Sequence, residues 1–108
     1  MYVTREQLEK DNDYHDFYKM PPDRQKKLLA WIDDNLMKDT KFNSRHTSYS
    51  IKTFVNLGAG ENSYFTNGEF KGAMLEAGFS YKNVDGINWI FNVHEDSLDW
   101  YDPYRCPV

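Results

Sequence analysis

The sequence predicts an α+β fold in which three or four helices are followed by a β-hairpin, and three observations support this class. Apolar residues recur at helical spacing in residues 22–36, 47–57 and 67–77. One stretch, residues 87–93, alternates large apolar and polar side chains as a half-buried strand does. The chain has 108 residues, the usual length of one domain, so we expect residues 1–108 to share a single core.

Residues 1–20 are predicted to form a loosely attached N-terminal helix. Thr4-Arg5-Glu6-Gln7 has the pattern of a capping box, in which a hydroxyl and an amide satisfy free backbone N–H groups at a helix start. The apolar face of this helix is thin because aspartates separate Leu8 from Phe17. Pro21-Pro22 ends it, since proline cannot continue a helix that it interrupts.

The next two helices have clearer boundaries. Asp23 opens the first, and its leucines and Ile32 follow the spacing of one buried stripe, with Trp31 at the border. Thr47 or Ser48 caps the second, which ends at Gly58 because glycine accepts the left-handed conformation of helix termini.

The last helix begins with another capping box, Thr66-Asn67-Gly68-Glu69, and ends at Gly78. The turn at residues 83–86 then introduces the strand. We expect one strand face to be buried and the other, with Asn88 and Asn92, to meet water, with Ile90 as the exception. Residues 94–108 are predicted to form an irregular acidic and aromatic tail.

This element order resembles a winged helix, with residues 67–77 in the place of the recognition helix and 83–86 at the wing tip. Two features oppose DNA binding by that helix. Its connection to the preceding helix is long, and Glu69 and Glu76 outnumber Lys71, so an acidic surface there would repel phosphates.

Composition excludes several classes of protein. Hydrophobic residues make up 40% and aromatic residues 17% of the chain, which is too apolar for disorder. No apolar run approaches the roughly 18 residues of a membrane helix, so we expect a cytoplasmic protein without a membrane partner. Cys106 is the sole cysteine and nearly the last residue, which argues against a disulfide, a thiolate metal site or a nucleophile.

Catalytic motifs are also missing from the sequence. There is no Gly-x-Ser-x-Gly elbow, and Gly58-Ala59-Gly60 lacks the later glycine and lysine of a phosphate-binding loop. We therefore expect no enzyme activity, no cofactor and no bound metal.

Charge is distributed unevenly. The net charge is -4, yet residues 38–52 carry four cations against Asp39. A DNA-binding regulator would use this patch, with Lys38, Lys41, Arg45 and Lys52 on the phosphates and Asn67 and Lys71 in the grooves. The whole-chain charge argues against this alternative.

Aromatic residues are more numerous than one small core can hide, with 3 Trp, 8 Tyr and 7 Phe. Exposed Tyr and Trp often dominate protein interfaces because they supply contact area at low entropic cost. Acidic and aromatic positions without a core role are our candidate protein-binding residues, namely Tyr14, Asp16, Tyr18, Glu69, Glu76, Trp100, Tyr101 and Tyr104. A homo-oligomer interface is another use for them.

Four segments carry a resemblance to known proteins: residues 48–52, 64–74 (YFTNGEFKGAM), 77–79 and 88–92 (NWIFN). Over residues 45–93 the chain resembles small proteins of phages, plasmids and integrative elements of Gram-positive bacteria. The resemblance implies an accessory role, such as regulating the element or blunting host defence, and brings no catalytic residues. We accordingly expect an inhibitor of the anti-CRISPR or anti-defence type, whose acidic surface occupies a basic site on a host nucleic-acid-processing protein.

Overall fold

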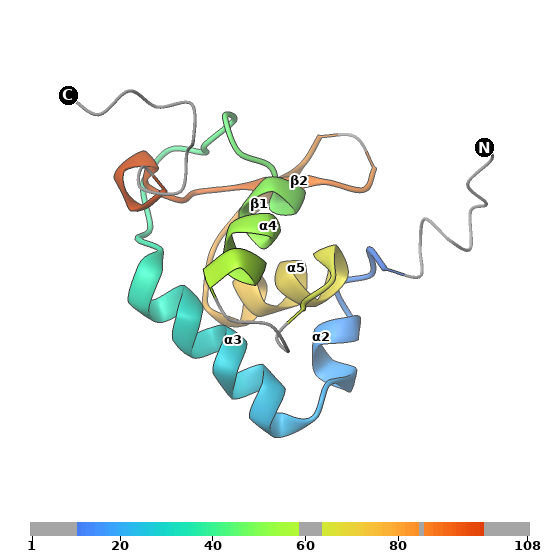
Figure 1. The fold of residues 1–108 in the computed structure, drawn as a ribbon. Coiled ribbons are helices and arrows are strands. Elements are labelled where there is room, and N and C mark those ends of the chain that lie inside the picture. The colour runs from blue at the N-terminus through green and yellow to red at the C-terminus, as the bar shows by residue number, and fades with distance from the viewer. Residues whose placement is uncertain (1–10, 59–63, 85, 99–108) are drawn as a thin grey trace.

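A computed structural model describes residues 11–58, 64–84 and 86–98. In chain order the elements are α2 (Asp16–Lys19), α3 (Pro22–Asn35), α4 (Ser48–Gly58), α5 (Asn67–Glu76), β1 (Tyr81–Asn83), β2 (Trp89–Phe91) and the 3-10 helix η1 (Glu95–Ser97). Helices followed by an antiparallel hairpin confirm the predicted α+β class (Figure 1). The predicted capping box at Thr4 lies outside the described residues.

Helix α5 lies at the centre of the molecule, with α2, α3 and α4 packed around it (Figure 1). Seven of its ten residues are buried. Phe70 stacks edge to face on Phe91 of the hairpin, with ring centroids 6.0 Å apart. The expectation that residues 67–77 form a surface recognition helix is therefore wrong, because this helix forms the middle of the core.

Local sequence determines where α5 begins and ends. The Thr66 hydroxyl accepts a hydrogen bond from the Glu69 backbone N–H at 3.1 Å, and the Glu69 carboxylate accepts one from the Thr66 N–H at 2.9 Å. This pair is the predicted capping box. Gly78 ends the helix with a φ of 89°, a conformation that other residues rarely adopt.

Two glycines four residues apart let the chain preceding and beginning α2 lie directly against α5. A Cβ at Gly68 would stand 2.7 Å from the Asp13 backbone nitrogen. A Cβ at Gly72 would overlap the Tyr14 carbonyl oxygen and stand 2.5 Å from the Phe17 Cβ. Only a residue without a side chain permits this approach.

The hairpin pairs Tyr81 with Phe91 and Asn83 with Trp89. The predicted strand 87–93 is shorter than expected, and all three residues of β2 are buried rather than alternate ones. The reason is a second neighbour: residues 38–47 run along the free edge of β2, where Thr47 bridges Ile90. Phe42 of this loop also lies against Lys82, the partner of Ile90, so the loop reaches the face that the sequence predicted to meet water.

The two asparagines of the predicted wet face are partly buried and bonded within the protein. Asn92 accepts a hydrogen bond from the Ser80 N–H at 2.7 Å and donates one to the Asp39 carbonyl at 3.1 Å. Within the described ranges, no helix has the length and apolarity needed to cross a membrane.

Candidate protein-binding surface

Helices α2 and α5 carry four of the predicted binding residues in two pairs, which we together call the acidic face: Asp16 and Glu69 line one hollow, and Tyr18 and Glu76 are hydrogen-bonded. Glu69 and Glu76 are seven residues apart, so both lie on one side of α5. The Tyr18 hydroxyl donates a hydrogen bond to the Glu76 carboxylate at 3.2 Å. The Tyr18 residue is nevertheless 51% exposed, so it presents an oriented ring to solvent.

The hollow that Asp16 and Glu69 line has a volume of about 320 Å³, and its lining also includes a third carboxylate, Asp11, and two cations, Lys19 and Arg24. Burial, and then the charge of Asp13, raise the pKa of Asp16 above its ordinary value. The nearby cations lie at long ion-pair distances, 3.7 Å for Lys19 to Asp16 and 3.9 Å for Arg24 to Glu69. Such pairs are weak at the surface and leave the carboxylates able to contact a partner.

The remaining predicted protein-binding residues do not extend the acidic face. Tyr14 is partly buried, and its ring centroid lies 4.0 Å from that of His15 and 5.7 Å from that of Trp89. Trp100, Tyr101 and Tyr104 lie outside the described residues.

The six residues predicted to bind DNA do not form one surface. Lys38, Lys41 and Arg45 are exposed on the loop between α3 and α4, whereas Lys52, Asn67 and Lys71 are buried.

Buried Lys71 has a structural role. Its ammonium donates hydrogen bonds to the carbonyls of Asn12 at 2.6 Å and Ile87 at 2.8 Å, and lies 4.5 Å from the Trp89 ring centroid. Asn67 donates to the Asn12 side chain at 2.8 Å. These side chains join α5 to its neighbouring loops, so the predicted groove contacts of Asn67 and Lys71 do not agree with their positions.

Lys52 is 5% exposed and belongs to an aromatic cluster that the sequence did not reveal. Its ammonium lies 4.1 Å from the Tyr49 ring centroid and 5.3 Å from that of Tyr64. Asn56 positions Tyr64 indirectly, since its amide exchanges two hydrogen bonds with the Phe65 backbone, at 2.8 and 3.0 Å. Lys52 therefore contacts aromatic rings, which does not agree with the phosphate contact of the DNA-binding alternative.

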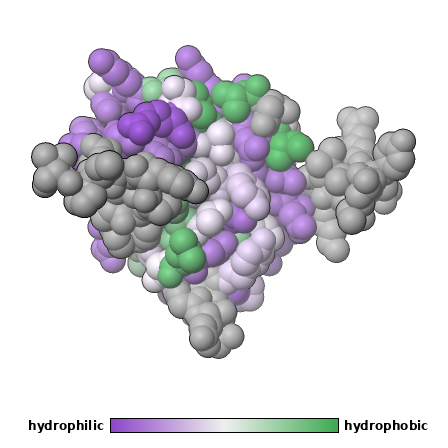
Figure 2. Space-filling view, turned by 45° about the horizontal axis from the view of Figure 1, so that its top comes forward, coloured by the Kyte–Doolittle hydropathy of each residue, from purple (hydrophilic) through white to green (hydrophobic). Residues whose placement is uncertain are grey.

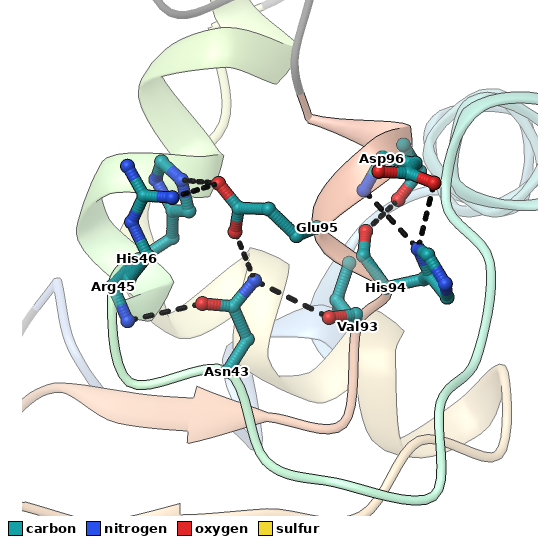
Figure 3. A network of polar contacts seen from close by, with 8 residues as sticks. Asn43, Arg45, His46, Val93, His94, Glu95 and Asp96 are labelled. Carbon is teal, nitrogen blue, oxygen red and sulfur yellow. Dashed lines mark hydrogen bonds and ion pairs between the residues drawn. The ribbon is translucent and has the colours of Figure 1, made fainter.

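Arg45 belongs to a polar network around Glu95 (Figure 3). Its guanidinium lies 3.2 Å from one Glu95 oxygen, and His46 Nε2 lies 3.3 Å from the same oxygen. Asn43 donates a hydrogen bond to the other oxygen at 2.7 Å. Burial acts to raise the pKa of Glu95, but the hydrogen bonds from Asn43 and His46 and the charges of His46 and Arg45 outweigh it and lower that pKa.

Exposed hydrophobic side chains are dispersed rather than gathered into one large patch on the face that Figure 2 shows, where separate green areas lie among purple ones. Across the described residues they include Met37, Tyr49, Leu57, Tyr64, Tyr81 and Val84 as well as Tyr18. Scattered exposed residues of this kind are ordinary, and Tyr18 is distinguished by its hydrogen bond to the Glu76 carboxylate.

The part of the chain that the structure describes contains no group of three or more His, Cys, Asp or Glu residues arranged to hold a metal ion. No protein-family model matches the chain, and comparisons with curated proteins and with solved structures give no significant match. The functional argument therefore depends on the acidic face itself.

Proposed function

We propose that this chain is a non-enzymatic accessory protein of a phage or mobile element that binds a host protein acting on nucleic acid, and by binding inhibits or modulates it. One observation carries the proposal: α2 and α5, packed together, present an exposed tyrosine hydrogen-bonded to the Glu76 carboxylate and a hollow lined by the carboxylates of Asp16 and Glu69. The proposal places its action in the host cytoplasm, where such enzymes work.

Carboxylates on a rigid surface resemble the phosphates that a nucleic-acid enzyme binds. The basic cleft of such an enzyme attracts any complementary array of negative charge, which speeds association and selects the partner. Asp16 and Glu76 come from different helices, so the spacing of their charges is determined by the fold rather than by a flexible segment.

Tyr18 adds affinity that charge alone does not supply. A tyrosine ring contributes large contact area at an interface, and its bond to Glu76 restricts its orientation before binding. Ordering a side chain in advance reduces the entropy that binding would otherwise lose.

The DNA-binding alternative receives less support. Three of its six residues are buried, and Arg45 is paired with Glu95. A net charge of -4 further opposes association with a polyanion.

The test is capture of host proteins by immobilised variants. The probe is the heparin-binding fraction of a Gram-positive lysate, which is enriched in proteins that bind nucleic acid. We expect the natural chain to retain specific proteins from this fraction and excess duplex DNA to release them. The double variant Asp16→Lys, Glu76→Lys should retain at least about tenfold less, because both charges are reversed.

Glu69 is left unchanged in this variant because its carboxylate also caps α5. The matched control is Asp34→Lys, Asp96→Lys, which makes the same change of charge at exposed positions outside the acidic face. Equal retention by both double variants, or retention that DNA does not compete, would show that the acidic face is not the binding surface.

A further inference from the structure

A groove of about 540 Å³ lies between the second half of α3 and the C-terminal end of α5. Its apolar lining comprises Leu29, Ile32, Leu36, Met37, Ala77 and Phe79. Three charged residues, Asp33, Lys38 and Glu76, complete the lining. Glu76 also belongs to the acidic face, so the groove and that face adjoin.

The electrostatic environment of the groove is negative. Helices α3 and α5 end here, at Asn35 and Glu76, and the C-terminal end of a helix carries partial negative charge from its free carbonyls. Asp33 lies in the last turn of α3, where a carboxylate is unfavourable for the helix, and the last turns of these two described helices contain no basic residue. Asp33 and Glu76 therefore add full negative charges to a groove that already lies at two helix C-termini.

The chain already places one cation at an end of this groove. The Lys38 ammonium lies 5.3 Å from the Phe79 ring centroid and close to Gly78, where a Cβ would stand 3.1 Å from Nζ. An ammonium beside an aromatic face and a helix C-terminus is an attractive arrangement. Lys38 therefore shows that the groove accommodates a basic side chain on an apolar surface.

We propose that this groove binds a cationic segment of the partner protein, with an apolar side chain on the floor and a lysine or arginine at Asp33 and Glu76. The inference rests on the proposed function and specifies the chemistry of the partner: the segment is both basic and apolar. A segment from the basic cleft of a nucleic-acid enzyme can then contact the acidic face and the groove together through Glu76.

The experiment compares two fluorescein-labelled helical peptides with identical leucine positions, one with lysines and the other with glutamates at all remaining positions. Fluorescence anisotropy at low salt should give at least about tenfold tighter binding of the lysine peptide to the natural chain. Asp33→Lys should weaken that binding about fivefold or more. Leu29→Gln, which changes the apolar lining without changing charge, should weaken it as well.

Asp23→Lys is the matched control, because it makes the same charge change in the first turn of the same helix, about 15 Å away along its axis. Thermal melts identify any variant that has lost its fold. Leu29→Gln tests the apolar lining of the groove and Asp33→Lys tests its charge, so each variant tests the proposal independently. The proposal would be overturned if both peptides bound equally, or if Asp23→Lys and Asp33→Lys had equal effects. It would also be overturned if sedimentation showed a dimer that the lysine peptide does not dissociate.

The two proposals fail separately. In the capture experiment, Asp33→Lys changes only the groove and Asp16→Lys changes only the acidic face. Loss of capture with Asp16→Lys but full capture with Asp33→Lys would refute the groove and leave the acidic face as the binding surface. Full capture with both would refute the proposed function as well.

Discussion

Replacing Gly72 by alanine tests the close packing of α2 on α5 that creates the acidic face. In an ordinary helix this substitution stabilises by about 1 kcal/mol, because alanine has the higher helix propensity. Here the added Cβ would overlap the Tyr14 carbonyl and lie 2.5 Å from the Phe17 Cβ. Carbon atoms pack at about 3.5–4.0 Å, so the two segments must separate by roughly 1 Å.

Overpacking of this kind costs about 1–3 kcal/mol, and we expect the upper end because the obstacle includes backbone. The net loss of unfolding free energy should be about 2 kcal/mol, which lowers Tm by roughly 10 °C in a domain of this size. Urea and thermal denaturation followed by circular dichroism measure both quantities. Gly86→Ala is the control: its φ is 86°, but no described atom lies within 4 Å of the added Cβ, so it should lose only about 1–2 kcal/mol. A Gly72→Ala chain as stable as the natural one would refute the packing described here.

Four further predictions concern single side chains. Thr66→Ala removes one half of the capping box and should reduce the unfolding free energy by about 1 kcal/mol in urea denaturation. Lys71→Met removes two charge-assisted hydrogen bonds to partly buried carbonyls and should cost about 2 kcal/mol or more in the same assay, whereas a surface lysine would cost almost nothing. The folded-state pKa of Glu95 lies below its ordinary 4.5. The ionised carboxylate therefore stabilises the fold above pH 4.5, and this contribution is lost as the pH falls through the lower folded-state pKa. Glu95→Gln should reduce the change in unfolding free energy between neutral and acidic pH. The pKa of Asp16 is raised, so its ionised form opposes folding, and Asp16→Asn should raise the thermal midpoint at pH 7 but not at a pH where the carboxyl is protonated.

Local signals predicted α3, α4 and α5 well because they act over a few residues, whereas the described part of the predicted N-terminal helix is helical only over Asp16–Lys19. The Thr66 to Glu69 capping box and the left-handed Gly78 define α5 whatever surrounds it. The stripe containing Leu28 and Ile32 similarly predicted the buried side of α3. Caps and periodicity are properties of the chain itself, so they could be read without knowing its neighbours.

Burial of polar residues could not be predicted in the same way. Lysine and asparagine are usually exposed, and Lys71 and Asn67 are buried because partners from distant segments satisfy them. The glycine pair Gly68 and Gly72 was a signal for close packing that helix periodicity does not consider. A helix surrounded on all sides has no polar face, so the sequence pattern did not indicate that α5 lies at the centre of the fold.

The candidate protein-binding residues stay a prediction. Asp16, Tyr18, Glu69 and Glu76 were chosen by charge and residue type, and packing between α2 and α5 places them in two pairs, Asp16 with Glu69 and Tyr18 with Glu76. The groove beside Glu76 was not anticipated, because its apolar residues were assigned to the core and its opening depends on where two helices end.

Footprinting of the captured complex tests most directly whether the acidic face makes the contact. Carbodiimide labelling reports the accessibility of the carboxylates of Asp16 and Glu76, and acetylation reports that of the exposed lysines Lys38 and Lys41. The account predicts that both carboxylates lose reactivity when the partner binds while Lys41 stays as reactive as in the free chain. Protection of Lys38 and Lys41 with unchanged labelling of Asp16 and Glu76 would contradict it.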